Sequence, residues 1–372
     1  MNQNDRISAR QLVALGFIAI LPPLIRRFPR ALAETAGRTA WLSVPLAALP
    51  LALAALLYCL LFRGKSAGTG FTKLLTDALG SFLGKFITGL YALWFLLYAG
   101  FLLRSGANRF ITAVYPGAAP WIFIVATALL CAMAAAGPLK ALGRTATLLR
   151  PFLALIPVLI LILTVKDADF TLLLPVTKAD LVPNALAALE NANLFGVAAY
   201  LAFCADRVDG PLRPRDWAGW AAALLAVLAM ITVGCLAMFG PELTAEMTHP
   251  FFLLARDVTI LGALERVEPV AVAIWVLADF VLIAALLWMA AGNFRFCFTK
   301  PQSDAPAANA QRGAWWLPAL CAALAATGAC LAPPDTETFA YLSDVAVPML
   351  SAAMAFGLPL IVLIVGKIRN TI

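Results

Sequence analysis

Residues 11–30 read QLVALGFIAILPPLIRRFPR, an apolar run that contains two adjacent prolines and ends in arginines. A run of this kind is typical of a helix that crosses a membrane, which needs about 20 predominantly apolar residues. Pro22 and Pro23 cannot donate backbone hydrogen bonds, and each ring clashes with the preceding helical turn. The stretch therefore predicts a first membrane helix that is broken at Ile20, Leu21, Pro22, Pro23 and Leu24.

The rest of the chain has the same apolar character. Of its 372 residues, 63% are hydrophobic and 13% are charged, and the mean hydropathy is +0.90. Such a chain cannot cover a water-soluble globule with polar surface, so lipid is its expected solvent. We predict an all-α membrane protein with one membrane domain, residues 1–372, a loop at Thr299–Gln311, and about ten transmembrane helices. The ten segments are 8–35, 39–62, 81–114, 119–136, 145–165, 183–205, 214–240, 265–291, 313–333 and 338–366.

Several classes of function are disfavoured by composition. The net charge of +7 is typical of cytoplasmic loops in a membrane protein, and no basic face interleaved with aromatics indicates a nucleic-acid partner. The seven cysteines stand singly without a CxxC pair, and His249 is the only histidine. These residues do not supply the ligand set of a metal site or a Cys/His nucleophile. We expect no catalytic residue, no metal and no cofactor, so the chain is not predicted to be an enzyme.

The lysines and arginines predict the orientation. Most of them fall on one side of the membrane if the amino terminus is cytoplasmic, and both termini are then cytoplasmic. Ten helices divide as five plus five, and an odd number in each half requires the second half to enter from the opposite face. This is the inverted-repeat plan of many transporters, with repeats at about 8–165 and 183–366.

The first helix of the second half contains a matching irregularity. Asn191, Asn193 and Gly196 place polar amides and a glycine within an apolar segment, which predicts a break in helix six. Paired breaks in the first helices of two repeats are typical of transporter binding sites. The alternative is an ordinary proline kink in helix one and a polar face on helix six, since neighbouring helices tolerate kinks.

Two regions of the sequence carry a family likeness. They are the run Ile7–Gln11 through Pro29 to Gly37–Ser43, and the later motifs His249-Pro250-Phe251, Leu261-Gly262, Leu264–Glu268 and Ile274-Trp275-Val276. In these residues and in its segment count, the chain resembles the spore germination permeases, the B subunits of germinant receptors. Pro22 and Leu24 stand where that family usually has glycines in the break of its first helix.

The resemblance implies a fold, a location and partners. The expected fold is that of the amino acid–polyamine–organocation superfamily, and the expected location is the inner membrane of a spore. The expected partners are an A-type and a C-type receptor subunit, membrane lipid and a small-molecule germinant, commonly a small amino acid.

Broken helices expose backbone groups that can bind a solute. The amino-terminal end of a half-helix presents free N–H groups to a carboxylate, and the opposing carbonyls suit an ammonium group or a cation. Asn193 can also cap the second half of helix six. Two tyrosines on one face of the third segment are a possible pocket wall or ordinary packing. The candidate binding residues are Ile20–Leu24, Asn193, Leu194, Phe195, Gly196, Tyr91 and Tyr98.

Four ionisable residues fall within apolar segments: Arg26, Arg27, Glu190 and Asp279. Each costs several kcal/mol if it is left unpaired in lipid, so we predict one charge system that gates the site or couples it to an ion. Snorkelling arginines and structural ion pairs are the alternatives. Asp279 is expected near the bilayer midplane, where it binds a cation, carries a proton or neutralises an arginine.

These observations lead to a permease-like, germinant-sensing subunit that binds a small amino acid or similar solute at the broken helices. The first alternative is a free-standing, ion-coupled amino acid transporter. The second is a structural subunit that has lost its ligand.

Overall fold

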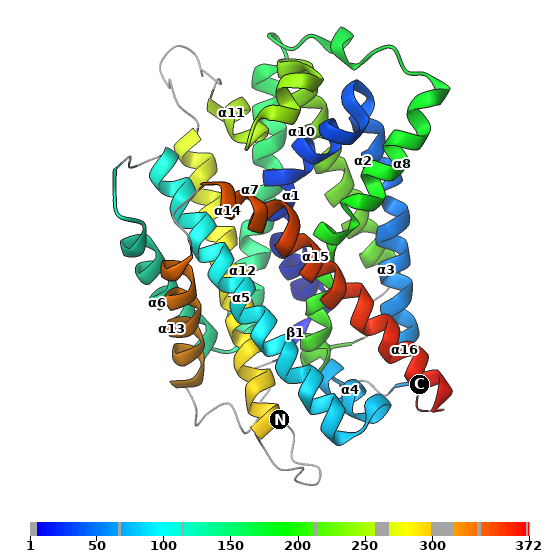
Figure 1. Ribbon diagram of the computed structural model, residues 1–372, viewed down its shortest axis with the longest axis vertical. Helices are drawn as coiled ribbons and strands as arrows, with labels where there is room; N and C mark the ends of the chain where they lie inside the picture. Colours follow the sequence, from blue (N-terminus) through cyan, green and yellow to red (C-terminus); the bar gives the residue numbers. More distant parts are fainter. Residues whose placement is uncertain are drawn as a thin grey trace.

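The protein is a bundle of long helices (Figure 1). The computed structural model describes residues 6–65, 68–113, 115, 117–210, 214–256, 268–298, 316–332, 336–369 and 371. The predicted loop at 299–311 and the motif residues 261–267 lie outside these ranges. The first half holds β1 (Ile7–Ser8), α1 (Ala9–Ala36), the 3-10 helix η2 (Gly37–Leu42), α2 (Ser43–Leu46), α3 (Ala48–Leu61), α4 (Phe71–Leu79), α5 (Ser81–Ala113), α6 (Pro120–Ala136) and α7 (Leu139–Thr164).

The second half begins after two short 3-10 helices, η3 (Phe170–Leu173) and η4 (Lys178–Asp180). It holds α8 (Leu181–Glu190), the 3-10 helix η5 (Ala192–Phe195), α9 (Gly196–Ala199), the 3-10 helix η6 (Tyr200–Arg207), β2 (Val208–Asp209), α10 (Pro214–Glu246), α11 (Pro250–Arg256), α12 (Glu268–Phe298) and α13 (Trp316–Leu331). The chain ends with α14 (Thr336–Tyr341), the π-helix η8 (Leu342–Ala346), α15 (Val347–Ala352), the π-helix η9 (Ala353–Gly357) and α16 (Leu358–Ile368).

The helices have the length and composition of membrane spans, so the chain is an integral membrane protein. Within the described ranges, seven helical runs are long and apolar enough to cross a bilayer, and the first of them, Ala9–Leu61, contains both α1 and α3. The shorter helices α6 and α13 are also apolar. Each of the ten predicted segments overlaps one of these helices, which confirms the all-α membrane fold. Their division into two inverted repeats stays a prediction.

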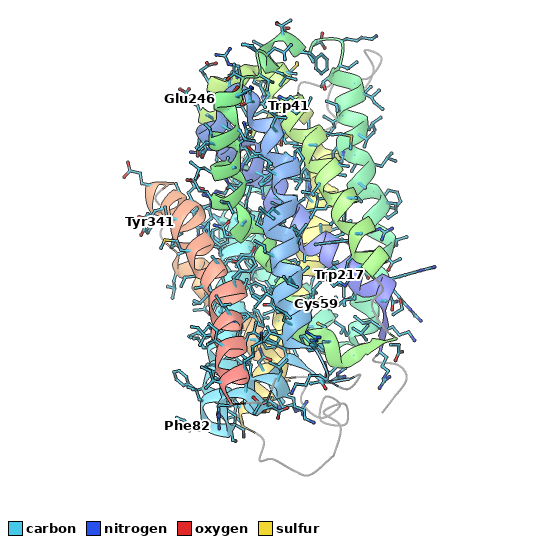
Figure 2. All side chains as sticks on the ribbon, turned by 90° about the vertical axis from the view of Figure 1, so that its right-hand side faces the viewer. Trp41, Cys59, Phe82, Trp217, Glu246 and Tyr341 are labelled. Carbon is cyan, nitrogen blue, oxygen red and sulfur yellow. The ribbon has the colours of Figure 1, made fainter. Side chains whose placement is uncertain are left out.

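Apolar side chains cover the outside of the bundle. On α5, Phe82, Phe86, Leu90, Leu93 and Leu97 are all exposed and recur every three or four residues. Residues at this spacing share one helix face, which here points away from the core toward lipid. Figure 2 shows the length of the bundle, with Phe82 of α5 near one end and Glu246 of α10 near the other.

Helix α1 runs through the middle of the bundle. It packs against α7, α8, α10 and α12, and 20 of its 28 residues are buried. A helix that is apolar all round is expected in such a position. Its start is held by a capping box, in which Ser8 Oγ accepts from the Gln11 amide at 3.3 Å and the Ser8 amide donates to Gln11 Oε1 at 2.9 Å.

The predicted break in this first helix is wrong, because α1 continues through Pro22 and Pro23 as one helix. Proline fixes φ near the helical value, so it removes hydrogen bonds without requiring the chain to leave the helix. The carbonyls of Ile18 and Ala19 lose their intrahelical donors as a result. Packing on every side of α1 holds the helical path in place of these bonds.

The helix that the sequence predicts to be broken near Asn191 is interrupted there. Helix α8 ends at Glu190, and Asn191 has non-helical dihedrals (φ −93°, ψ 5°) before η5 begins. The Asn191 side chain donates to the Ala187 carbonyl at 2.9 Å, and this carbonyl also accepts from the Asn191 backbone amide at 3.2 Å, so Asn191 holds the end of α8. The polypeptide then continues through three short helices, η5, α9 and η6, to Arg207.

A two-residue parallel strand pair closes one end of the bundle. Ile7 pairs with Val208 and Ser8 pairs with Asp209, and Arg6 forms an ion pair with Asp209 at 2.7 Å. The start of α1 is thereby tied to the end of the interrupted helix. We call this end the strand end; it also holds the end of α16, whereas α2 and α11 lie at the opposite end (Figure 1).

Gly100 on α5 provides a test of the packing. A methyl group added there would lie 2.9 Å from the Ala325 carbonyl oxygen of α13, whereas Gly328 on α13 has nothing within 4 Å of the same added atom. We predict that Gly100→Ala lowers stability by roughly 1–3 kcal/mol because α13 must move away. Gly328→Ala should be neutral or stabilising by up to about 1 kcal/mol, since alanine favours helix. Thermal unfolding in detergent measures both variants, and equal effects would contradict the close approach.

Candidate functional site

A polar cavity lies where α1 meets two composite helices. These are the interrupted helix, which runs from α8 to η6, and the last helix, which runs from α14 to α16. Its lining comes from α1, α5, η5, α9, η8 and α15. The lining residues are Pro23, Arg26, Arg27, Tyr98, Phe101, Asn193, Leu194, Val197, Ser343, Val347, Pro348 and Ser351. Charged, hydroxyl and amide groups thus converge on a space with apolar walls, which is the usual chemistry of a small-molecule site.

The cavity is nearly closed. Its free volume is about 20 Å³, roughly the space that one water molecule needs. Known ligand pockets are an order of magnitude larger, so a solute can enter only when the surrounding helices move apart. The structure is therefore an occluded arrangement of the bundle.

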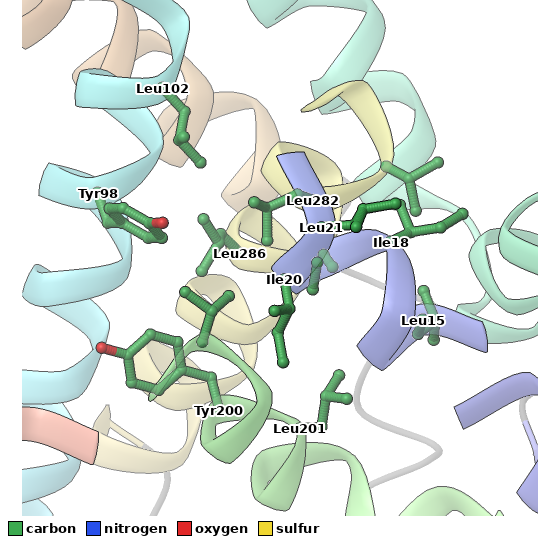
Figure 3. Close-up of a cluster of buried hydrophobic side chains, with 14 of the residues drawn as sticks. Leu15, Ile18, Ile20, Leu21, Tyr98, Leu102, Tyr200, Leu201, Leu282 and Leu286 are labelled. Carbon is green, nitrogen blue, oxygen red and sulfur yellow. The ribbon is translucent and has the colours of Figure 1, made fainter. Parts of the chain in front are cut away.

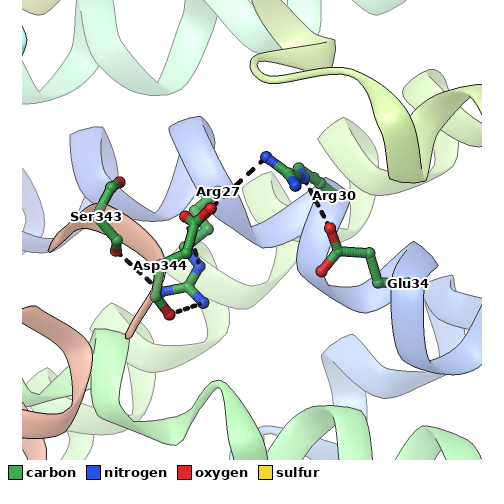
Figure 4. A network of polar contacts seen from close by, with 5 residues as sticks. All are labelled: Arg27, Arg30, Glu34, Ser343 and Asp344. Atoms are coloured by element: carbon green, nitrogen blue, oxygen red, sulfur yellow. Dashed lines mark hydrogen bonds and ion pairs between the residues drawn. The ribbon is translucent and has the colours of Figure 1, made fainter. Parts of the chain in front are cut away.

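One arginine of the cavity holds α1 against the last helix (Figure 4). Arg27 donates to the Asp344 carbonyl at 2.7 Å and to the Ser343 carbonyl at 3.3 Å, and its guanidinium lies 3.8 Å from the Asp344 carboxylate. Arg30 contacts the same carboxylate at 3.8 Å and Glu34 at 2.7 Å. Ser343 and Asp344 belong to the π-helix η8, whose irregular backbone presents carbonyls that an α-helix would use internally.

The second arginine, Arg26, is almost fully buried. Its side chain is 9% exposed, and it donates to Ser105 Oγ at 2.8 Å while its guanidinium lies 5.5 Å from the centre of the Phe101 ring. A cation over an aromatic face is stabilised by the ring, although by less than an ion pair would provide. Asp279 and Arg109 are within electrostatic range of Arg26.

Asp279, which is buried, forms an ion pair with Arg109 of α5, whose side chain is 11% exposed. The predicted single charge system is therefore wrong in its pairings: Arg27 binds Asp344, Arg26 binds Ser105, and Glu190 accepts from Thr35 at 3.1 Å. The physical reason is lateral position. Arg26 and Arg27 extend from α1 toward different helices and Glu190 lies beside Thr35, so each contacts the nearest neighbour that can satisfy it.

The predicted binding residues divide into two groups. Pro23, Tyr98, Asn193 and Leu194 line the cavity, as do Arg26 and Arg27. The others are packed elsewhere. Ile20 and Leu21 lie in the apolar cluster beside Leu282 and Leu286 (Figure 3), and Pro22 and Leu24 are buried in α1. Phe195 packs edge-on against Phe28, a methyl group added at Gly196 would lie 2.8 Å from Ala355 Cβ, and Tyr91 donates to the Met354 carbonyl. Leu24 therefore takes no space from the cavity.

Several cavity residues come from places that the sequence reasoning did not single out. Phe101 belongs to the third segment, and Ser343, Val347, Pro348 and Ser351 belong to the last. Ser343-Asp344 at the start of an apolar segment was a usable signal, because ionisable residues there need a partner. The spacing of Ser105 and Arg109, one helical turn apart in another apolar segment, was a second signal.

His249 directly precedes α11 and lies outside the membrane-spanning runs. It is close to Arg26 and Arg109. Burial and the nearby Arg26 and Arg109 cations lower the pKa of His249 to about 4. The imidazole is therefore neutral at physiological pH. Its Nδ1 atom is buried and has no hydrogen-bond partner within the described part of the chain.

No described group of three or more His, Cys, Asp or Glu residues is placed to hold a metal ion. The cavity instead presents guanidinium, hydroxyl and amide groups among interrupted helices. A membrane-spanning helical bundle with such a site is a permease-like protein.

Comparison with known proteins identifies the family. The chain belongs to the family described as spore germination protein, whose sequence model matches residues 6–324. The fold is also that of a solved Na⁺-coupled sialic acid symporter in a substrate-bound, outward-open state. That similarity has a TM-score of 0.57 at 14% identity and covers 95% of this chain and 79% of the symporter, so it shows a shared fold. A search of curated proteins finds no match.

The Arg109–Asp279 pair can be tested by a double-mutant cycle. We predict that Asp279→Asn destabilises the protein by about 3–5 kcal/mol, because it leaves a largely buried arginine without its counter-ion. Adding Arg109→Gln should recover much of the loss. Thermal unfolding of the two single variants and the double variant gives the coupling energy. Additive effects would show that the pair is energetically unimportant.

His249 predicts a pH dependence of stability. Its folded pKa of about 4 lies below the ordinary value of 6.5, so protons bind preferentially to the unfolded chain between these values. Stability should therefore decline as the pH falls below 6.5. Because His249 is the only histidine, His249→Gln should flatten the unfolding temperature between pH 6.5 and 5. An unchanged slope would contradict the assignment.

Proposed function

We propose that this chain is the permease-like subunit of a spore germinant receptor and that it binds a small amino acid or similar solute in the cavity between α1, α5, η5 and α15. The observation that carries the proposal is the convergence of Pro23, Asn193 and Ser351 on one polar cavity, in a chain of the spore germination protein family. The cavity residues provide binding groups, and the proposal includes no catalytic step.

The receptor setting is part of the same proposal. The chain resides in the inner membrane of the spore with both termini cytoplasmic, and an A-type and a C-type subunit assemble with it. Ligand binding separates the helices that close the cavity, and the partner subunits respond to that movement. The Arg27 contacts to η8 support this view, because they join two helices through groups that also line the cavity.

A cavity-filling variant tests the site. Val347 of α15 lines the cavity, whereas Val345, two residues earlier in η8, is exposed and does not line it. We predict that Val347→Phe weakens solute binding at least about tenfold, since the ring occupies the closed space. Val345→Phe should leave binding unchanged. The measurement is thermal stabilisation of the purified chain by amino acids, sugars and nucleosides.

Five outcomes separate the possibilities. Equal responses of the two variants would place the solute elsewhere, and the absence of any stabilising solute would indicate a subunit without a ligand. Uptake by proteoliposomes that contain this chain alone would favour a free-standing transporter over a receptor subunit. Co-purification with A-type and C-type subunits would support the receptor, and a cysteine at position 371 that resists an impermeant maleimide added outside would support the orientation.

A further inference from the structure

We infer that the cavity selects a small organic anion, whose carboxylate binds Arg26 and whose neighbouring uncharged hydrogen-bond donor binds Asn193. A 2-hydroxy acid is the simplest ligand of this class. The inference rests on the proposed function, because it names the chemistry of the solute at the same site.

Arg26 is the first observation. Its guanidinium has five N–H donors, and its one hydrogen bond to another described side chain goes to the neutral Ser105 hydroxyl. The nearest carboxylate, that of Asp279, is already bound by Arg109. Arg26 lines the cavity, so its remaining donors are available to a ligand there. A buried cation without its own counter-ion is costly, and an anionic ligand removes that cost.

The charges around the cavity do not balance. Arg26, Arg27, Arg30 and Arg109 are four cations, whereas the carboxylates that contact them in the described structure are Glu34, Asp279 and Asp344. One positive charge is in excess. His249 adds no negative charge, and its pKa is lowered first by burial and then by the Arg26 and Arg109 cations. No acidic side chain is among the residues that line the cavity.

Asn193 is the second, independent observation. Its side-chain oxygen is buried and has no hydrogen-bond partner among the described residues, although the residue lines the cavity. A buried carbonyl oxygen of this kind is a ready acceptor for a ligand donor. A hydroxyl group fits this position better than an ammonium group. Arg26 and Arg27 would repel the positive charge of the ammonium group, and no lining carboxylate would pair with it.

The electrostatic part can be measured without knowing the natural ligand. Ser343 lines the cavity, so Ser343→Cys places a thiol there in a chain that also carries Cys59→Ser and Cys330→Ser to remove the exposed cysteines. The two probes are the sulfonatoethyl and trimethylammonioethyl methanethiosulfonates, which differ in charge. We expect faster labelling by the anionic reagent, relative to a free thiol, and a several-fold loss of that preference in Arg26→Gln.

Two further variants control this measurement. Arg10→Gln removes the same charge from an exposed position on the same helix, and it should leave the labelling preference intact. Arg26→Lys keeps the charge and should keep the preference even if the glutamine variant folds poorly. A preference for the cationic reagent, or one that does not depend on Arg26, would overturn the inference. It would leave the proposed function standing.

The ligand class is tested on the purified chain with L-lactate, L-alanine, propionate and L-lactamide. We expect L-lactate to stabilise the protein most, and Arg26→Gln to weaken lactate binding roughly 30-fold or more. Asn193→Ala should remove the advantage of lactate over propionate. If L-alanine binds more strongly than L-lactate and Arg26→Gln does not change its affinity, the anion site is refuted but the proposed function is supported. Binding of no solute in the wider screen, together with no labelling at position 343, would refute both.

Discussion

The structure depends on the burial of α1 at the centre of an apolar bundle. Polar groups on this helix can be satisfied only by protein or by a bound molecule, because lipid and apolar side chains supply no partners. Two prolines remove backbone donors from its middle, and two arginines follow one turn later. The positions of α5, α11 and the last helix can be understood from the need to surround these groups.

The two arginines are satisfied in different ways, and this difference gives the site its character. Arg27 is held by backbone carbonyls and a carboxylate of the last helix, where the π-helix η8 turns those carbonyls toward it. Arg26 has a hydroxyl and an aromatic ring. One arginine therefore joins α1 to the last helix, whereas the other has no carboxylate of its own among the described residues. The second π-helix, η9, has a similar joining role, since Tyr91 and Tyr58 donate to the Met354 and Ala355 carbonyls.

The occluded cavity follows from contacts at several levels of the bundle. The strand pair and the Arg6–Asp209 ion pair join α1 to the interrupted helix at the strand end. The Arg27 and Arg30 contacts with Asp344 join α1 to the last helix beside the cavity. Apolar packing accompanies these polar contacts, since α1 also packs on the interrupted helix, where Phe28 meets Phe195, as well as on α10 and α12.

The sequence by itself determined the class of protein, the positions of the membrane helices and the interruption after Glu190. These features depend on local properties, namely apolar length, charge spacing and the preferences of asparagine and glycine. It also indicated Pro23, Arg26, Arg27, Tyr98, Asn193 and Leu194, which the tertiary structure brings to one cavity. The continuity of α1 through its prolines was not predictable locally, because packing from all sides decided it.

Only the tertiary structure decided which charged groups meet. Arg109 and Asp279 are 170 residues apart in the chain, and Arg27 and Asp344 are 317 apart. Sequence gives the depth of a residue along its helix but not the rotation of that helix about its axis or the identity of its neighbours. Electrostatic attraction acts on the groups that lie closest in space, so the pairing, and with it the unpaired charge of Arg26, followed from how the helices pack.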